Sequence, residues 1–282
     1  MKKHLLTLFL LLFSGLGLCA QSSPQKNAVL DSLVLNYVEF IQPQSVESKQ
    51  KECDFLINSV NDEGMRSHIA QTLFEYYKEP PVMGDEEVAI YIYDKWFASG
   101  PYKFDGEFSA LEAEMFVNLN RNTMLGMDAP VLNAVKPCGG KKTIPAKGGT
   151  SILWFYDTAC SKCRIESKLL PGVLERGVDF PVTLVAFYTG ADRKAWREFR
   201  RSFKVDNPNV RVEHYWDRTY SSDYQRLYAV VDTPKMYVVA PEGSIIGRRL
   251  ELDALVELLP IAKEIDAVFS KKNKFISNFN KN

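Results

Sequence analysis

The segment "YDTACSKCRIES" contains two cysteines, Cys160 and Cys163, with two residues between them. Residues three apart on a helix face the same side, so the two thiols would be close enough to interconvert between a dithiol and a disulfide. A disulfide between residues this close in the chain closes almost no loop and removes little chain entropy. The spacing therefore favours a chemically reactive pair over a structural cross-link.

The residues around the pair predict where it lies in the fold. The preceding run "TSILWFYD" is continuously apolar, which is typical of a strand buried on both faces. A helix is predicted from Ser161 to about Arg176, which puts Cys160 at its first turn. There the unpaired backbone N–H groups, the helix dipole and the adjacent Lys162 favour a thiolate. We expect the pKa of Cys160 to fall from about 8.5 into the range ~3.5–7.5.

The rest of the C-terminal half alternates strands and helices. We predict a second buried strand for "FPVTLVAFY" and then a helix capped by Asp192 for "DRKAWREFRRSF". A short helix follows in "SSDYQRLYAV", and a hairpin in "PKMYVVAPEGSIIGRRL". The segment "LDALVELLPIAKEIDAVF" is predicted to form a closing helix. This order predicts an α/β domain over residues 123–282, with a mixed central sheet flanked by helices.

The N-terminal half predicts a small all-α domain over residues 21–122. Apolar residues recur at helical spacing in four segments, "AVLDSLVLNYVEFI", "HIAQTLFEYYKE", "EEVAIYIYDKWF" and "FSALEAEMFVNLNRNTML". Breaks rich in proline and glycine separate most of these segments. No catalytic motif is recognisable in this half.

Residues 1–20 have the pattern of a secretory signal peptide. Lys2 and Lys3 precede an apolar run that ends in small residues, and cleavage after Ala20 is predicted. The alternative is a lipid anchor on Cys19, although Leu18 stands where Gly, Ala or Ser usually precedes a lipid-bearing cysteine. No later run approaches the ~18 apolar residues of a membrane span. We therefore expect a periplasmic protein without a stable membrane span after signal removal.

Composition argues against two classes of ligand. The chain has 35 basic and 35 acidic residues, so nothing favours a nucleic-acid partner electrostatically. A zinc site at the cysteine pair would need two more ligands, and only the isolated Cys53, Cys138, His68 and His214 are available. No metal and no cofactor are predicted. Cys53 and Cys138 fall in different predicted domains and could form an interdomain disulfide or remain free thiols.

Residues 126–270, about half of the chain, resemble the thioredoxin fold and, within it, the exported thiol–disulfide oxidoreductases of the TlpA and ResA type. The resemblance is carried by "GMDAP", which begins an extra hairpin, and by "ILWFYD", "CSKC", "VDTPKMYVV" and "APEGSIIGR". It implies a periplasmic reductase of disulfides in exported proteins, with a membrane thiol carrier as electron donor. Residues 21–122 more loosely resemble a helical domain of unknown function that precedes such modules.

The resemblance also implies roles for individual residues. Cys160 would be the attacking thiol and Cys163 the resolving thiol. Pro234 would be a cis-proline whose loop, with Thr233, lies beside the sulfurs and binds an extended substrate. Glu166 matches an acidic residue that tunes the cysteines and can move protons.

The alternative for Glu166 is an exposed helix carboxylate that pairs with Lys162 or Lys168. The sequence also departs from the thioredoxin pattern. Trp154 stands where thioredoxins have a buried acid, six residues before the first cysteine, so that proton relay is expected to be missing. Ala159 replaces the usual tryptophan before the motif, and Tyr156 fills the aromatic position in the strand.

Two other functions remain open from the sequence. One is a binding or scaffold protein whose thioredoxin-like half has little redox turnover. The other is a peroxidase, in which a lone cysteine follows a threonine by three residues; here Thr158 precedes Cys160 by two, and a second cysteine follows. The motif also does not distinguish a reductant from an oxidant or an isomerase.

Overall fold

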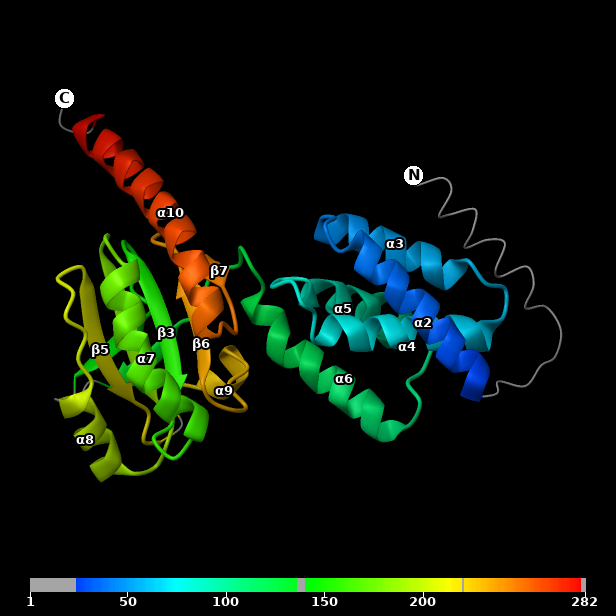
Figure 1. Cartoon of the computed structure of the whole chain (residues 1–282), viewed down its shortest axis with the longest axis horizontal. Helices are drawn as coiled ribbons and strands as arrows, with labels where there is room; N and C mark the ends of the chain where they lie inside the picture. Colours follow the sequence, from blue (N-terminus) through cyan, green and yellow to red (C-terminus); the bar gives the residue numbers. More distant parts are fainter. Residues whose placement is uncertain (1–23, 136–139, 220, 280–282) are drawn as a thin grey trace. The chain divides into compact units, whose positions relative to one another are not determined.

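The computed structural model describes residues 24–135, 140–219 and 221–279 (Figure 1). The predicted signal peptide, Cys19 and Cys138 lie outside these residues. The chain divides into two compact units, which we call unit 1, up to Val117, and unit 2, from Asn118. Each unit is described by itself.

Unit 1 is helical over its described residues. Its elements are α2 (Pro24–Ile41), α3 (Val46–Asn58), α4 (Glu63–Lys78), α5 (Glu86–Ile92), the π-helix η1 (Tyr93–Ala98) and most of α6 (Glu107–Asn120). The four predicted helical segments cover each of these elements except α3, whose sequence "VESKQKECDFLIN" is rich in charged residues. Cys53, Leu56 and Ile57 pack inward and are buried, whereas Phe55 is 39% exposed.

The core of unit 1 also contains an ion pair. Lys49 Nζ lies 2.8 and 2.6 Å from the two carboxylate oxygens of Asp85, and both side chains are buried. Aromatic rings fill much of the remaining interior, with Phe74 edge-on to Phe104 and Phe97 stacked on Phe104. Cys53 lies in this core with no exposed surface.

Unit 2 is built on a five-stranded mixed sheet with the order β5-β4-β3-β6-β7. Its strands are β3 (Thr150–Tyr156), β4 (Val182–Tyr188), β5 (Val210–Trp216), β6 (Lys235–Val239) and β7 (Ile245–Gly247). Strands β3, β4 and β5 are parallel, whereas β6 runs antiparallel to β3 and β7 antiparallel to β6. A separate two-stranded hairpin, β1 (Leu132–Val135) and β2 (Lys141–Ile144), follows "GMDAP" as predicted.

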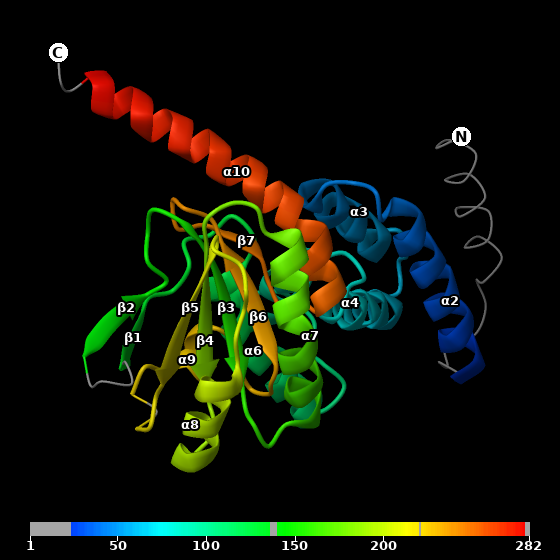
Figure 2. The ribbon, with the colours of Figure 1, turned by 60° about the vertical axis from the view of Figure 1, so that its left-hand side comes forward.

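Helices and the hairpin cover the two faces of this sheet. The helices are α7 (Ser161–Gly177), α8 (Arg193–Ser202), α9 (Tyr224–Leu227) and α10 (Leu252–Phe279), and a short 3-10 turn, η2 (Arg121–Thr123), precedes the sheet. Trp154 and Tyr156 of β3 pack toward α7, α8 and α10, whereas Leu153 and Phe155 pack toward β1, β2 and α9. Figure 2 shows α7 and α10 side by side against the strands. The central strand is therefore buried on both faces, as its apolar run predicts.

Two elements of unit 2 differ from the prediction. Strand β5 was not predicted, because at the edge of the sheet its sequence "VRVEHYW" mixes charged with apolar residues. The charge of Glu213 on this strand is balanced by Lys142 on β2, whose Nζ lies 2.6 Å from the carboxylate. Helix α10 extends to Phe279, beyond the predicted closing helix.

Candidate functional site

Cys160 occupies the N-cap position of α7. Its backbone is extended, with φ −71° and ψ 126°, and its Sγ accepts a hydrogen bond from the Cys163 backbone N–H at 3.2 Å. The turn before it is closed by Asp157, whose carboxylate accepts the Ala159 N–H at 2.9 Å and whose carbonyl accepts the Cys160 N–H. The first sulfur thus takes the place that a serine or aspartate oxygen takes at other helix starts.

The surroundings of Cys160 favour its thiolate. Partial burial acts to raise the pKa of this thiol, but hydrogen bonds from the Cys163 side chain and backbone outweigh it. Contacts with the Thr233 side chain and the Lys162 backbone act in the same direction, so the pKa of Cys160 lies below its ordinary value. This agrees with the expected direction and attributes it to donors at the helix start.

Cys163 lies one turn further along α7 and is only 2% exposed. Burial, followed by the hydrogen bond with Cys160, raises the pKa of Cys163 to about 12. Both cysteines are free thiols in the structure. The two sulfurs are therefore unequal: Cys160 is partly exposed and its pKa is lowered, whereas Cys163 is buried and its pKa is raised.

The loop before β6 lies against the first sulfur. The Thr233–Pro234 peptide bond is cis, as the resemblance implied. The Cys160 thiol donates to the Thr233 carbonyl oxygen at 3.2 Å. Residues 73 apart in the sequence thus meet at the sulfur, because β6 pairs with β3, the strand that leads into Cys160.

Glu166 lies on the buried face of α7, and the predicted alternative of an exposed carboxylate is wrong. Its side chain accepts a hydrogen bond from Trp154 Nε1 at 3.0 Å, and the residue is 5% exposed. Burial raises the pKa of Glu166, while the Trp154 hydrogen bond opposes that shift. Lys162, one of the two predicted partners, instead pairs with Glu251 at 2.6 Å.

The contact between Trp154 and Glu166 could not be read from the sequence. The two residues lie 12 positions apart on different elements, and no local pattern connects a tryptophan in a strand with a glutamate in a helix. The proton relay of a strand acid was expected to be missing because Trp154 stands at its position, whereas the resemblance gave Glu166 as an acid that can move protons. The structure instead brings a buried carboxylate to Trp154 from α7.

The other sequence candidates lie apart from this constellation or find different partners. The Thr158 hydroxyl, on which the peroxidase alternative depended, lies 3.3 Å from the Tyr188 hydroxyl. Among the described residues, no group of histidine, cysteine and carboxylate side chains could hold a metal ion. The proposed pairing of Cys53 with Cys138 stays a prediction, since Cys138 lies outside the described residues.

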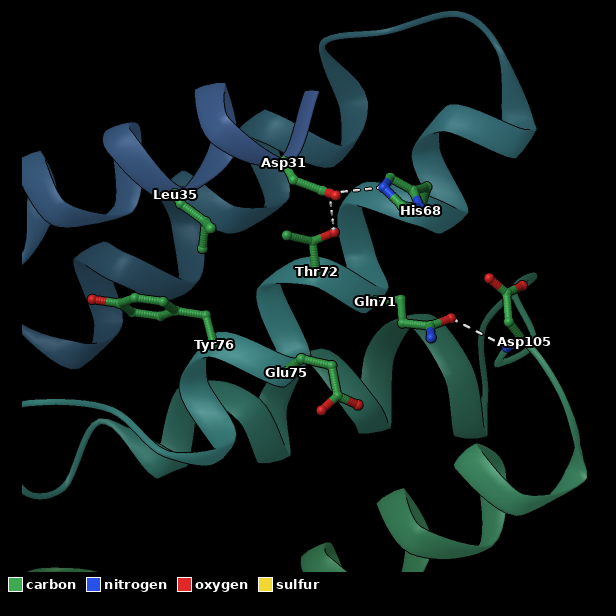
Figure 3. Close-up of a pocket in the computed structure, with 8 residues that line it drawn as sticks. All are labelled: Asp31, Leu35, His68, Gln71, Thr72, Glu75, Tyr76 and Asp105. Carbon is green, nitrogen blue, oxygen red and sulfur yellow. Dashed lines mark hydrogen bonds and ion pairs between the residues drawn. The ribbon is translucent and has the colours of Figure 1, made fainter. Parts of the chain in front are cut away.

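Unit 1 contains a cavity of about 350 Å³ that sequence reasoning missed (Figure 3). It is lined by Asp31, Leu35, His68, Gln71, Thr72, Glu75, Tyr76 and Asp105. Asp31 Oδ1 accepts the Thr72 hydroxyl at 2.9 Å and lies 2.7 Å from His68 Nε2. Because the hydroxyl bonds to the carboxylate and not to the imidazole, this trio lacks the nucleophile-to-base hydrogen bond of a hydrolase triad.

No protein-family model matches the sequence, and no curated protein matches it. The structure is similar to that of a thioredoxin-like protein from Bacteroides caccae, with a TM-score of 0.64 and 16% identity over 83% of this chain and 84% of that one. Unit 2 has a thioredoxin-like fold. The predicted fold class, a thioredoxin-like domain preceded by a helical region, is thereby confirmed.

Shorter structures cover about half of this chain. A domain of a possible thiol-disulfide isomerase from Cytophaga hutchinsonii is 23% identical, with a TM-score of 0.44, and covers 51% of this chain and 97% of that one. The thioredoxin domain of a thiol-disulfide oxidoreductase from Bacteroides vulgatus is 22% identical, with a TM-score of 0.42, and covers 50% of this chain and 97% of that one.

Across the described residues, the helices are too short or too polar to cross a membrane.

Proposed function

We propose that the protein is an exported thiol–disulfide oxidoreductase that reduces disulfides in other exported proteins. The observation that carries the proposal is the inequality of the two sulfurs at the start of α7. Cys160 is accessible and has a lowered pKa, whereas Cys163 is buried directly behind it with a raised pKa. Thiol–disulfide exchange needs these two roles, a reachable thiolate and a sheltered second thiol.

The reaction has two steps. The Cys160 thiolate attacks one sulfur of a client disulfide, a mixed disulfide forms, and the other client sulfur leaves as a thiolate that takes a proton. Cys163 then loses its proton and attacks Cys160 Sγ, which releases the second client sulfur as a thiol. The client gains two electrons and two protons, and the Cys160–Cys163 disulfide is left behind. A membrane thiol carrier would then reduce this disulfide by the same exchange.

Two further groups would serve the reaction. The Thr233–Pro234 loop lies against Cys160 Sγ, so an extended client segment could pair with its backbone while its disulfide is attacked. Glu166 is a buried carboxylate one turn from Cys163 and would accept the proton of the resolving thiol. An ionised carboxylate is only a hydrogen-bond acceptor, so it can accept a hydrogen bond from the Cys163 thiol and then take its proton.

The signal peptide predicted from the sequence supports the periplasm as the site of action. An oxidising compartment contains the protein disulfides on which such a reductase would act. The N-terminal sequence of the protein recovered from a periplasmic extract tests this assignment. We expect Gln21 to be the first residue. A lipid-modified Cys19 in the membrane fraction would show instead that the exported protein is lipid-anchored. An uncut chain in the cytoplasm would contradict export.

Turnover of insulin disulfides, with dithiothreitol supplying electrons, tests the activity. The wild-type chain should accelerate the reduction well above the uncatalysed rate, and the Cys160→Ser variant should not. Equal rates with and without the protein would leave a binding module as the better account.

The reduction potential of the Cys160–Cys163 couple tests the direction. Disulfide reductants and strong oxidants differ by about 150 mV, or roughly 7 kcal/mol for two electrons. Equilibration with glutathione buffers should give a potential toward the thioredoxin end, near about −270 mV. A value near about −120 mV would exclude the reductase.

A further inference from the structure

Trp154 and Glu166 meet beneath the start of α7. Trp154, in the central strand β3, is fully buried, and its indole N–H points to Glu166 Oε2 at 3.0 Å. Glu166 lies one turn along α7 from Cys163 on the same face, and both are buried. The carboxylate one turn along α7 from the resolving thiol thus accepts a hydrogen bond from a neutral donor in the sheet.

We infer that Trp154 is a positioning residue for the resolving step: its indole N–H holds the charged Glu166 carboxylate ready to accept the proton of Cys163. This inference rests on the proposed function. An indole N–H can only donate a hydrogen bond, so Trp154 contributes no base of its own and acts through Glu166. The strand supplies the donor and the helix supplies the acid.

Two charged residues face Glu166 from the elements around it. Lys162 on α7 and Glu251, just before α10, pair with each other at 2.6 Å on the surface. Burial has the largest effect on the pKa of Glu166 and raises it; the Trp154 hydrogen bond and Lys162 lower it, and Glu251 raises it. Removal of the indole N–H leaves burial less opposed, so Glu166 would hold its proton to a higher pH.

The consequence concerns the resolving step. Cys163 gives its proton to Glu166, Cys163 Sγ bonds to Cys160 Sγ, and the bond between Cys160 and the client sulfur breaks with both electrons going to the client. Only ionised Glu166 can accept that proton, so the rate should rise with pH through the midpoint of Glu166. A hydrogen bond to a charged group is worth roughly one to two pH units, so Trp154→Phe should raise this midpoint by about one unit.

The experiment isolates the resolving step. The chain from residue 21 to 282, with Cys53→Ala and Cys138→Ala, is reduced and mixed with excess 5,5′-dithiobis(2-nitrobenzoate) in a stopped-flow instrument. Cys160 releases one thionitrobenzoate at a rate that depends on reagent concentration, and Cys163 releases the second at a rate that does not. Because thionitrobenzoate leaves as an anion and needs no proton, the second phase reports how Cys163 loses its proton.

A matched control is available in the same core. Trp196 is also buried against the α7 side of the sheet, and its indole Nε1 has no hydrogen-bond partner in the described structure. Trp196→Phe removes an indole N–H that holds nothing, so the midpoint should stay where it is. Glu166→Gln should remove the pH step itself, and Trp154→Phe added to it should cause no further shift.

The possible outcomes separate the inference from the function on which it rests. If the wild type releases two equivalents and only Trp154→Phe moves the midpoint upward, the inference holds. An unchanged midpoint in Trp154→Phe, or an equal shift in Trp196→Phe, would overturn it and leave the oxidoreductase intact. If the reduced wild type released no second equivalent at any pH, the proposed function itself would fail.

A second measurement needs no change at Trp154. The indole ¹H–¹⁵N resonance of Trp154 in the native chain should move with pH at the midpoint of the resolving step, and Glu166→Gln should abolish that movement. A Trp154 resonance that does not respond to pH would overturn the inference even where Trp154→Phe proved unstable.

Discussion

Cysteine thiols in the two units differ in how exposed they are and in the direction of their pKa shifts. Cys53 in unit 1 has no exposed surface, and burial, with the charge of Asp54, raises its pKa strongly. Cys160 in unit 2 is partly exposed at a helix start, and hydrogen bonds lower its pKa. A thiol becomes reactive when donors face its sulfur and a partner can reach it.

Two buried carboxylates also have different partners in the two units. Asp85 in unit 1 contacts the ammonium group of Lys49 through both oxygens, which stabilises its charge within a closed core. Glu166 in unit 2 receives a neutral indole N–H, and no described ion pair includes its carboxylate. Burial raises the pKa of both carboxylates. The shift is opposed at Asp85 by the full counter-charge of Lys49 and at Glu166 by the neutral Trp154 N–H. The two units therefore differ in the group that opposes the effect of burial on a carboxylate, an ammonium in the core of unit 1 and an indole N–H at the start of α7.

The largest expected effect separates the two sulfurs of unit 2. Cys163→Ser should trap mixed disulfides with exported client proteins, because Cys160 still attacks but nothing resolves the product. Cys160→Ser should trap none and should lose turnover entirely, because the buried Cys163 cannot be reached by a client. Non-reducing gels of periplasmic extracts show the complexes as high-mass bands that disappear with reductant. Trapping by Cys160→Ser alone would reverse the assigned roles.

A break in the core of unit 1 should leave the sulfur site in unit 2 unaffected. Lys49→Met leaves the buried Asp85 carboxylate without its counter-ion, which should cost about 3–5 kcal/mol of stability. Urea denaturation measures the loss, and iodoacetamide should then modify Cys53, which is sealed in the wild type. The alkylation rate of Cys160 below the unfolding transition should be unchanged. A variant as stable as the wild type would show that the buried pair contributes little to the core.

How far the sequence predicted this molecule depends on how local each feature is. Cys160 at a helix start follows from a buried strand run and the helical pattern after it, all within about thirty residues. The loop at Pro234 was predicted only through a family resemblance, because 73 residues separate it from the sulfur. The Trp154–Glu166 contact was not predicted, since it depends on how α7 packs on β3.

Two elements that mix charged with apolar residues were also missed for a physical reason. Strand β5 is at the sheet edge, where Arg211 and Glu213 reach solvent or pair with charged neighbours. Helix α3 buries only a narrow apolar face, so its sequence lacks the broad stripe by which the other helices were recognised. Sequence patterns report burial, and they weaken where an element is only half covered.

A histidine in unit 2 gives a smaller and pH-dependent effect. Burial, followed by the charges of Arg200 and Lys204, lowers the pKa of His214 to about 4, and its Nδ1 has no hydrogen-bond partner in the described structure. The unfolded chain would take up a proton near pH 6.5, so stability is present above that value and is lost as the pH falls toward about 4. The loss should be roughly 1–3 kcal/mol.

His214→Phe tests this account, because Phe199 and Phe203 already lie edge-on to the imidazole. Urea denaturation of both proteins from pH 8 downward should give parallel stabilities until about pH 6.5, after which the wild type falls more steeply. Identical pH profiles would show that His214 is hydrated enough to be protonated in the folded chain.

The smallest expected effect is on turnover when the remaining cysteines are removed. Cys53 is buried in unit 1, and Cys138 lies outside the described residues and outside the motif at the start of α7. Replacement of both by Ala should leave insulin reduction within about twofold of the wild type, since neither thiol takes part in the exchange. Stability should fall by about 1 kcal/mol for the small cavity at Cys53, and by more if the two cysteines form a disulfide, because a cross-link that closes a long loop contributes about 2–5 kcal/mol. Mass spectrometry of the alkylated wild type decides between those stability outcomes. If a folded double variant lost turnover, Cys53 or Cys138 would take part in the exchange. The contrast between the buried thiol of unit 1 and the reactive pair of unit 2 would then be wrong.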